Sequence, residues 1–193
     1  MSLPPPPIPN AYWVLPGQFM AGAYPAVPYS DEATRTLLSR LLDRGLRCFI
    51  NLAQPGEAPD YQRLLHEQAG WLGVTAHYHA FPLETAPVIE PARMSAILDQ
   101  IDSALEQGQG VYVHCRAGIG RTGAVVGCFW VRRGLSGPHA LVQIAKLRAE
   151  LTAEPPHRGM PSPDSQPLRD LILRWETADP RRKTPAPGDT KGE

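Results

Sequence analysis

The chain has 193 residues, of which 42% are hydrophobic and 20% charged, so it is long enough and apolar enough for one globular domain with a substantial core. Its 19 basic and 19 acidic residues cancel, and no overall field favours nucleic acid or an anionic membrane as a partner. The sequence lacks both an apolar run of roughly 18 residues and a secretory signal, so we expect a cytoplasmic protein.

The ends of the chain differ in composition from its centre. Residues 1–10 are predicted to form a proline-rich arm, either a loosely packed or unpacked leader or a polyproline II segment for an aromatic-lined groove. Residues 177–193 have no apolar periodicity and are predicted to be a disordered tail. One domain is expected between them, over residues 11–176.

Strand and helix patterns alternate along this domain. Two short strand segments are predicted within 12–21, and Ser30 is a candidate cap for a helix that Gly45 ends. The later elements are expected in the order strand 46–52, helix 61–69, strand 74–81, helix 91–107, strand 111–113, helices 121–133 and 137–150, and helix 168–175. This alternation predicts an α/β fold with a mostly parallel central sheet flanked by helices, and a ligand site at the carboxyl ends of the strands.

A glycine-bearing loop with the sequence HCRAGIGRTG follows the strand at 111–113. Its glycines match the G-x-G-x-x-G dinucleotide pattern, but that pattern should open the first strand-helix unit and be followed by an acidic residue for the ribose. The loop lies late in the chain, and 121–149 contains no Asp or Glu. Dinucleotide binding is therefore disfavoured, and the C-x5-R spacing of Cys115 and Arg121 becomes the informative pattern.

This spacing suits a phosphate ester. A five-residue loop that enters a helix can turn its amides inward, and the helix N-terminus adds positive charge. Arg121 can bind two phosphate oxygens with its planar fork, and the same charges favour the nucleophilic thiolate of Cys115. The expected phosphate-binding residues are Arg116, Ala117, Gly118, Ile119, Gly120 and Arg121.

The loop resembles the H-C-x-x-G-x-x-R-[ST]-G signature of the cysteine-dependent protein tyrosine and dual-specificity phosphatases at every fixed position. The flanking segments WVLPGQFMAGAYP, FINL, YHAFPL and PSPDSQPLRDLILRW are similar to the compact bacterial dual-specificity-like branch, so the resemblance spans most of 12–176. It implies a protein tyrosine phosphatase-like fold and two-step hydrolysis through Cys115, without a metal or organic cofactor. It also implies that His114 orders the loop and that Thr122 assists the thiolate or the second step, although both residues also suit purely local polar roles.

Two family positions differ in this chain. The resemblance places the general-acid Asp where this chain has Thr85, so the neighbouring Glu84 is the candidate acid, with a solvated loop glutamate as the alternative. The family glutamine that helps to place the attacking water corresponds to Leu168, and Gln166 lies two residues earlier as its candidate substitute.

The expected partner is a phosphorylated protein or a small phosphate monoester, with no nucleic acid and no membrane. Phosphotyrosine proteins are the first candidate substrates, followed by phosphoserine or phosphothreonine proteins. A phosphoinositide or inositol phosphate is the weaker option, because Arg116 adds one loop charge and Ile119 adds none. The alternative from another class is a phosphate-binding pseudo-phosphatase with weak activity.

The remaining cysteines and the strand histidines are predicted to have no part in chemistry. Cys48 and Cys128 are expected in the core, and the three cysteines have no metal-ligand spacing. His77 and His79 share one face of a strand without further ligands nearby, so exposed histidines are expected and no metal site is predicted.

Overall fold

A five-stranded sheet separates two layers of helices in the computed structural model, which describes residues 5–84, 89–149, 151 and 159–183. The strand order is β1-β2-β5-β3-β4; β1 is antiparallel to β2 at one edge, and every other neighbouring pair is parallel. This arrangement confirms the mostly parallel α/β sheet expected from the sequence. The strands are β1 Ala11–Leu15, β2 Phe19–Gly22, β3 Leu46–Asn51, β4 His77–Ala80 and β5 Gly110–His114.

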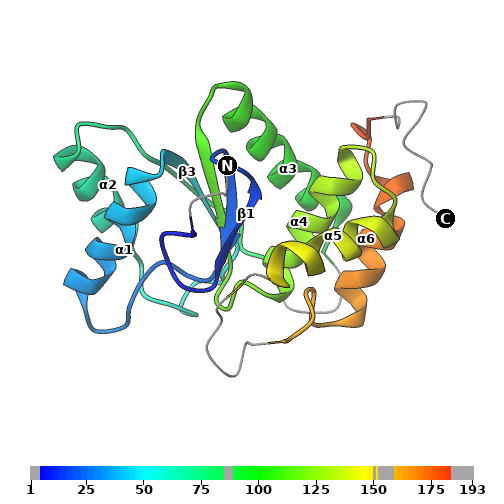
Figure 1. Ribbon diagram of the computed structural model, residues 1–193, viewed down its shortest axis with the longest axis horizontal. Coiled ribbons are helices and arrows are strands. Elements are labelled where there is room, and N and C mark those ends of the chain that lie inside the picture. The colour runs from blue at the N-terminus through cyan, green and yellow to red at the C-terminus, as the bar shows by residue number, and fades with distance from the viewer. Residues whose placement is uncertain (1–4, 85–88, 150, 152–158, 184–193) are drawn as a thin grey trace.

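Helices α1 and α2 cover one face of the sheet, and α3 to α6 lie on the other (Figure 1). They are α1 Asp31–Asp43, α2 Gln62–Trp71, α3 Pro91–Glu106, α4 Gly120–Arg132, α5 Gly137–Ala149 and α6 Gln166–Ala178. The main departure from the expected elements is β4, which is half as long as the predicted strand 74–81 because only His77–Ala80 pair with β3.

Apart from the edge strand β4, the sheet is largely buried on both faces, and β5 at its centre shows how the chain divides the core. Val111 and Val113 pack in the cluster under α3 to α6, whereas Tyr112 between them packs in the cluster under α1 and α2. Because side chains alternate along a strand, this division follows directly from the sequence. The residues after β5 therefore start from a rigid, fully buried position.

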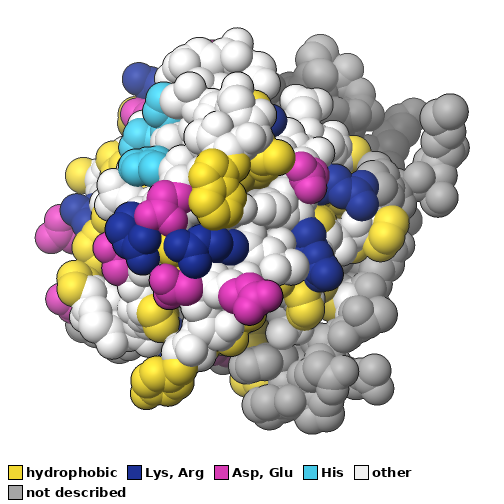
Figure 2. Space-filling view, turned by 90° about the vertical axis from the view of Figure 1, so that its left-hand side faces the viewer, with side chains coloured by type: hydrophobic (Ala, Val, Ile, Leu, Met, Phe, Trp, Pro, Cys, Tyr) yellow, Lys and Arg dark blue, Asp and Glu magenta, His cyan; other side chains and the backbone are white. Residues whose placement is uncertain are grey.

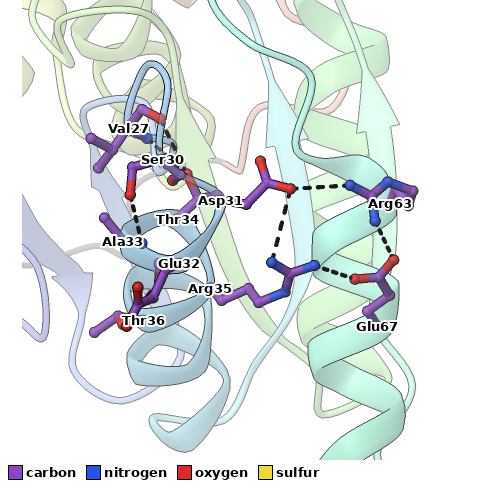
Figure 3. A network of polar contacts seen from close by, with 10 residues as sticks. All are labelled: Val27, Ser30, Asp31, Glu32, Ala33, Thr34, Arg35, Thr36, Arg63 and Glu67. Atoms are coloured by element: carbon purple, nitrogen blue, oxygen red, sulfur yellow. Dashed lines mark hydrogen bonds and ion pairs between the residues drawn. The ribbon is translucent and has the colours of Figure 1, made fainter.

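Polar contacts join α1 to α2 (Figure 3). The Ser30 hydroxyl caps α1 by accepting a hydrogen bond from the N–H three residues on. Asp31 lies within ion-pair distance of Arg35 and Arg63, and both arginines also contact Glu67. On the face that these helices present, acidic and basic side chains are interleaved (Figure 2). This face thus carries no extended patch of one charge.

The described structure continues beyond the predicted tail boundary. Helix α6 runs to Ala178, and Asp179 after it is buried, so residues 177–183 belong to the folded chain instead of a disordered tail. Asp179 pairs with buried Arg132 at 2.7 Å, and although burial opposes its charge, the contacts with Arg132 lower the pKa of Asp179. At the other end, Ile8 of the predicted arm packs in the cluster under α1 and α2.

No helix among the described residues is both long and apolar enough to cross a membrane.

Candidate active site

Three parallel strands end side by side at the edge of the sheet that carries the C-x5-R loop. Gly22 at the end of β2 and Asn51 at the end of β3 both lie opposite His114, the last residue of β5. The segments that follow these strands must therefore meet. The sequence prediction of a site at the carboxyl ends of the strands thus coincides with the position of Cys115.

The loop after β5 is tightly folded, and its conformation depends on glycine. Gly118 has φ +73°, and a Cβ there would lie 2.4 Å from the carbonyl carbon of Gly22. A larger residue would therefore clash with the backbone of β2. The N–H of Gly118 points into the loop and donates to Sγ of Cys115 at 3.2 Å.

Three carbonyl groups of the loop are held outward by donors from three other segments. The Arg116 carbonyl accepts from the Tyr24 N–H at 3.1 Å, and the Gly118 carbonyl accepts from Arg148 at 3.0 Å. The Ile119 carbonyl accepts from the Ser162 hydroxyl at 2.7 Å. In a trans peptide the carbonyl and the next N–H point in opposite directions, so these bonds turn the following amides inward. Such inward amides form an anion-binding nest.

Cys115 and Arg121 occupy the two ends of this nest. The Cys115 side chain is in the core cluster and the residue is only 3% exposed, while α4 begins at Gly120 with its N-terminus toward the loop. Arg121 follows in the first turn and is 6% exposed. The structure therefore places the nucleophile candidate, the loop amides and Arg121 in one loop and in the first turn of the helix that follows it.

Glu57, which the sequence prediction omits, binds the Arg121 guanidinium through both carboxylate oxygens, at 3.1 and 2.7 Å. The Nη1 of Arg121 also donates to the carbonyls of Leu52 and Leu83, each at 3.2 Å. Burial opposes the charge of Glu57, but Arg121 prevails and lowers its pKa, so Glu57 is ionised at neutral pH. Glu57 follows β3 at the predicted edge, and that position was the signal available in the sequence.

His114 lies behind the loop as a neutral, fixed side chain. Burial lowers the pKa of His114 to about 3, and its Nε2 is 2.6 Å from the Tyr61 hydroxyl. Its ring stacks on Tyr112, with centroids 5.4 Å apart. The recorded side-chain contacts of His114 thus link the loop to the α1 and α2 layer.

The two polar residues assigned to the second step have different surroundings. Thr122 is completely buried in the first turn of α4, and its hydroxyl has no hydrogen-bond partner among the described residues. Gln166 is exposed and donates to Asp170 on its own helix. Their roles with the thiolate and the attacking water stay predictions.

Two carboxylates are candidate acids. Glu84 is exposed and directly follows Leu83, whose carbonyl contacts Arg121. Thr85 lies outside the described residues. The second carboxylate, Asp164, is close to Gly120: a Cβ added there would lie 2.6 Å from Oδ1 of Asp164. Sequence reasoning missed Asp164 even though it lies in PSPDSQPLRDLILRW, one of the flanking segments that resemble the family.

The other cysteines and histidines lie apart from this arrangement. Cys48 and Cys128 are fully buried in the core, as expected, and burial raises the pKa of Cys48 to about 11 and that of Cys128 as well. On β4, His77 is exposed and His79 is partly buried. Within the described ranges, no group of three or more His, Cys, Asp or Glu side chains is arranged to hold a metal ion.

Comparison with known proteins gives one family match and several relatives. The model of the family "Tc-R-P: Polymorphic toxin system, DSP-PTPase phosphatase" matches residues 23–135. "Protein tyrosine phosphatase domain-containing protein 1" of Mus musculus is 30% identical over 105 residues, which are 49% of this chain and 14% of the mouse protein. The Danio rerio protein of the same name is 31% identical over 97 residues, 45% of this chain and 13% of that protein. The chain thus spans only a small part of these relatives.

Solved structures share the fold. Tk-PTP in its active form is 22% identical with a TM-score of 0.64, covering 87% of this chain and 97% of its own. P. aeruginosa TpbA is 16% identical with a TM-score of 0.63, and the match covers 93% of this chain and 92% of the TpbA chain. PTPMT1 in complex with PI(5)P is 18% identical with a TM-score of 0.60, and the match covers 86% of this chain and 94% of the PTPMT1 chain.

Proposed function

The chain belongs to the cysteine-dependent protein tyrosine and dual-specificity phosphatases, in the DSP-PTPase family of polymorphic toxin systems, and from this premise we propose that it hydrolyses phosphate monoesters through a cysteinyl-phosphate on Cys115. The observation that carries the proposal is the loop itself. Its outward carbonyls leave inward amides beside Sγ of Cys115, and Arg121 stands at the far end. This arrangement suits three phosphate oxygens on one side of a sulfur nucleophile.

Each half of the proposed reaction conserves atoms and charge. The Cys115 thiolate attacks phosphorus, an S–P bond forms, and the ester oxygen leaves with a proton from a general acid. Water then attacks the cysteinyl-phosphate and gives one proton to the conjugate base of the general acid, the S–P bond breaks, and inorganic phosphate and the thiolate are released. In both steps the loop amides and Arg121 stabilise the equatorial oxygens as their charge grows.

For the substrate class we propose phosphotyrosine in proteins first, then phosphoserine or phosphothreonine. A structure of P. aeruginosa TpbA holds pTyr, which supports this order by analogy of fold. The PTPMT1 complex with PI(5)P keeps a phosphoinositide as the third candidate. Between Cys115 and Arg121 the loop has one basic side chain, Arg116, and this single charge favours a monoester over a polyphosphorylated head group.

Glu84 is the proposed acid, and Asp164 is the competing candidate. Glu84 follows a residue whose carbonyl contacts Arg121, and its segment is the one that carries the acid in the family. Asp164 is favoured by its closeness to Gly120 inside the loop. Glu57 is not a suitable donor, because its contacts with Arg121 hold it in the ionised form.

Leaving-group dependence tests the function and identifies the acid. Turnover of aryl phosphates with good and poor leaving groups is measured for the parent, Glu84→Gln and Asp164→Asn. The variant that lacks the acid should lose on the order of 10²- to 10⁴-fold with the poor leaving group and much less with the good one, because only a basic oxygen needs the proton. Glu90→Gln, an exposed change at the start of α3, is the matched control.

Two outcomes contradict parts of the proposal. Parent-like rates for Glu84→Gln and Asp164→Asn with the poor leaving group mean that neither carboxylate is the acid. A parent protein that binds vanadate but does not turn over even the good leaving group is a phosphate-binding pseudo-phosphatase.

A further inference from the structure

A cleft of about 350 Å³ lies between the last turns of α5 and the segment 159–163, which are yellow and orange in Figure 1. Its volume is in the range of small-ligand sites, about 300–1,000 Å³. Most of its lining is apolar, and Met160 in its wall is 39% exposed. The apolar lining residues are Leu141, Ala145, Ala149, Leu151, Met160 and Pro161.

Two arginines give this apolar cleft a positive charge. Arg148 and Arg169 both line it, and each is partly buried. Within the described residues, both guanidinium groups donate to backbone carbonyls, Arg148 also lies over the ring of Tyr12 with Cζ 5.7 Å from its centroid, and no carboxylate pairs with either arginine. Such groups retain N–H donors for an anion, and Arg–carboxylate contacts are among the strong charge-assisted hydrogen bonds.

The cleft also touches the phosphate loop. Arg148 donates from Nη1 to the carbonyl of Gly118 at 3.0 Å. Ser162, another lining residue, donates to the carbonyl of Ile119 at 2.7 Å. Anything that binds Arg148 in the cleft therefore acts on a group that helps to orient the peptides of the loop.

We propose that this cleft is a second ligand site, which binds a small amphipathic carboxylate. The apolar body of the ligand packs against the residues around Met160, and Arg148 and Arg169 hold its carboxylate. Because Arg148 also holds the carbonyl of Gly118, binding in the cleft changes the surroundings of the phosphate loop. This site is separate from the oxyanion nest, and its occupant is neither substrate nor product of the proposed reaction.

Octanoate is a suitable probe, and octan-1-ol is its uncharged counterpart. Both are titrated into the full chain by calorimetry, and the amide signal of Gly118 is followed by NMR during the titration. Octanoate should bind at least 10-fold more tightly than octan-1-ol and should shift the Gly118 signal. Arg169→Gln and Arg148→Gln should each weaken octanoate binding at least 10-fold. Lys146→Gln, an equal charge change at an exposed position of α5 outside the cleft, should not.

Several results would overturn this assignment. Equal binding of octanoate and octan-1-ol would mean that the arginines do not hold a carboxylate. Equal effects of Arg169→Gln and Lys146→Gln would place any octanoate elsewhere, and an unmoved Gly118 signal during saturable binding would refute the link to the loop. Because none of these measurements requires turnover, they can fail or succeed independently of the proposed phosphatase reaction.

Discussion

The guanidinium of Arg121 has more than one hydrogen-bonding edge, and Glu57 occupies the edge formed by Nη1 and Nη2. Because this contact restrains the orientation of the guanidinium and leaves its Nε edge without Glu57, we propose that Glu57 is a positioning residue for the phosphate contact. The bond also keeps a buried cation paired when no phosphate is bound, which reduces the cost of its desolvation.

Glu57→Gln should lower kcat/KM for an aryl phosphate by roughly 10- to 100-fold, because hydrogen bonds to charged groups contribute about 1.5–3 kcal/mol. Vanadate affinity should fall in parallel. Glu67→Gln, in the surface network between α1 and α2, is the matched control and should be silent. Higher activity in Glu57→Gln would mean that Glu57 competes with phosphate instead of positioning Arg121.

The neutral state of His114 predicts a pH-dependent stability. Its pKa is about 3 in the folded chain and about 6.5 when unfolded, so below pH 6.5 the unfolded chain binds a proton that the folded chain does not. Stability should therefore fall as the pH drops from 6.5 toward 3, by up to about 1.4 kcal/mol per pH unit from this residue. Urea unfolding at pH 7, 6 and 5 measures the slope, and His114→Gln should have the smaller slope. Parallel slopes would show that His114 is not the cause.

At the scale of single residues, the sequence predicts the residues at the two ends of the loop better than the residues from other segments that contact the loop. Cys115 and Arg121 are predicted from the local C-x5-R spacing, because a thiolate and a guanidinium at that spacing suit a phosphate ester. Glu57 and Asp164 reach the loop across 64 and 44 residues of chain, and such contacts depend on how strands and helices pack. No local pattern reveals Glu57, although the edge of the sheet where it lies was predictable, whereas Asp164 lies in the segment PSPDSQPLRDLILRW that resembles the family.

Among the elements, helices with a regular apolar stripe were predicted most closely. Predicted helix 91–107 and observed α3 differ by one residue, because buried residues recur at helical spacing throughout. The strand predicted at 74–81 is shorter in the structure, since alternation of side chains alone does not show where a neighbouring strand stops. The last helix extends past its predicted end because Asp179 is held by a residue far away in sequence, Arg132.

The contact between α4 and the end of α6 holds in place the helix that follows the phosphate loop. Arg132 is 2% exposed and binds Asp179 through two nitrogens, at 2.7 and 2.9 Å. Asp99 and Asp102 of α3 pair with the same guanidinium at 2.7 and 3.1 Å. The three elements are thus joined at the end of α4 opposite the loop.

Asp179→Asn should lower the free energy of unfolding by on the order of 3 kcal/mol, because removing one partner leaves part of a buried charge uncompensated. Asp170→Asn removes an equal charge within α6 at a side chain that accepts from Gln166, and it should change the free energy of unfolding little. Denaturant unfolding of both variants gives the comparison. Equal stability of the two would show that the buried pair does not hold α6 to α4.

At the scale of the whole molecule, the sheet places the phosphate loop at one edge and brings the segments that contact the loop to the same edge. The segment after β2 contributes Tyr24, the segment after β3 contributes Glu57, and α5 contributes Arg148. Each contacts the loop from a different part of the fold. We propose that residues 11–176 together with the packed residues through 183 form one folding unit, because the site is complete only when all these parts are assembled.

The central claim is a covalent phosphate on Cys115, and rapid quenching of a reaction with an aryl phosphate followed by peptide mass spectrometry tests it most directly. We predict a transient phosphate on the peptide that contains Cys115, no such species and no turnover in Cys115→Ser, and an unchanged species in Cys128→Ser, the core control. Turnover by the parent without phosphate on that peptide, or substantial activity in Cys115→Ser, would contradict the account.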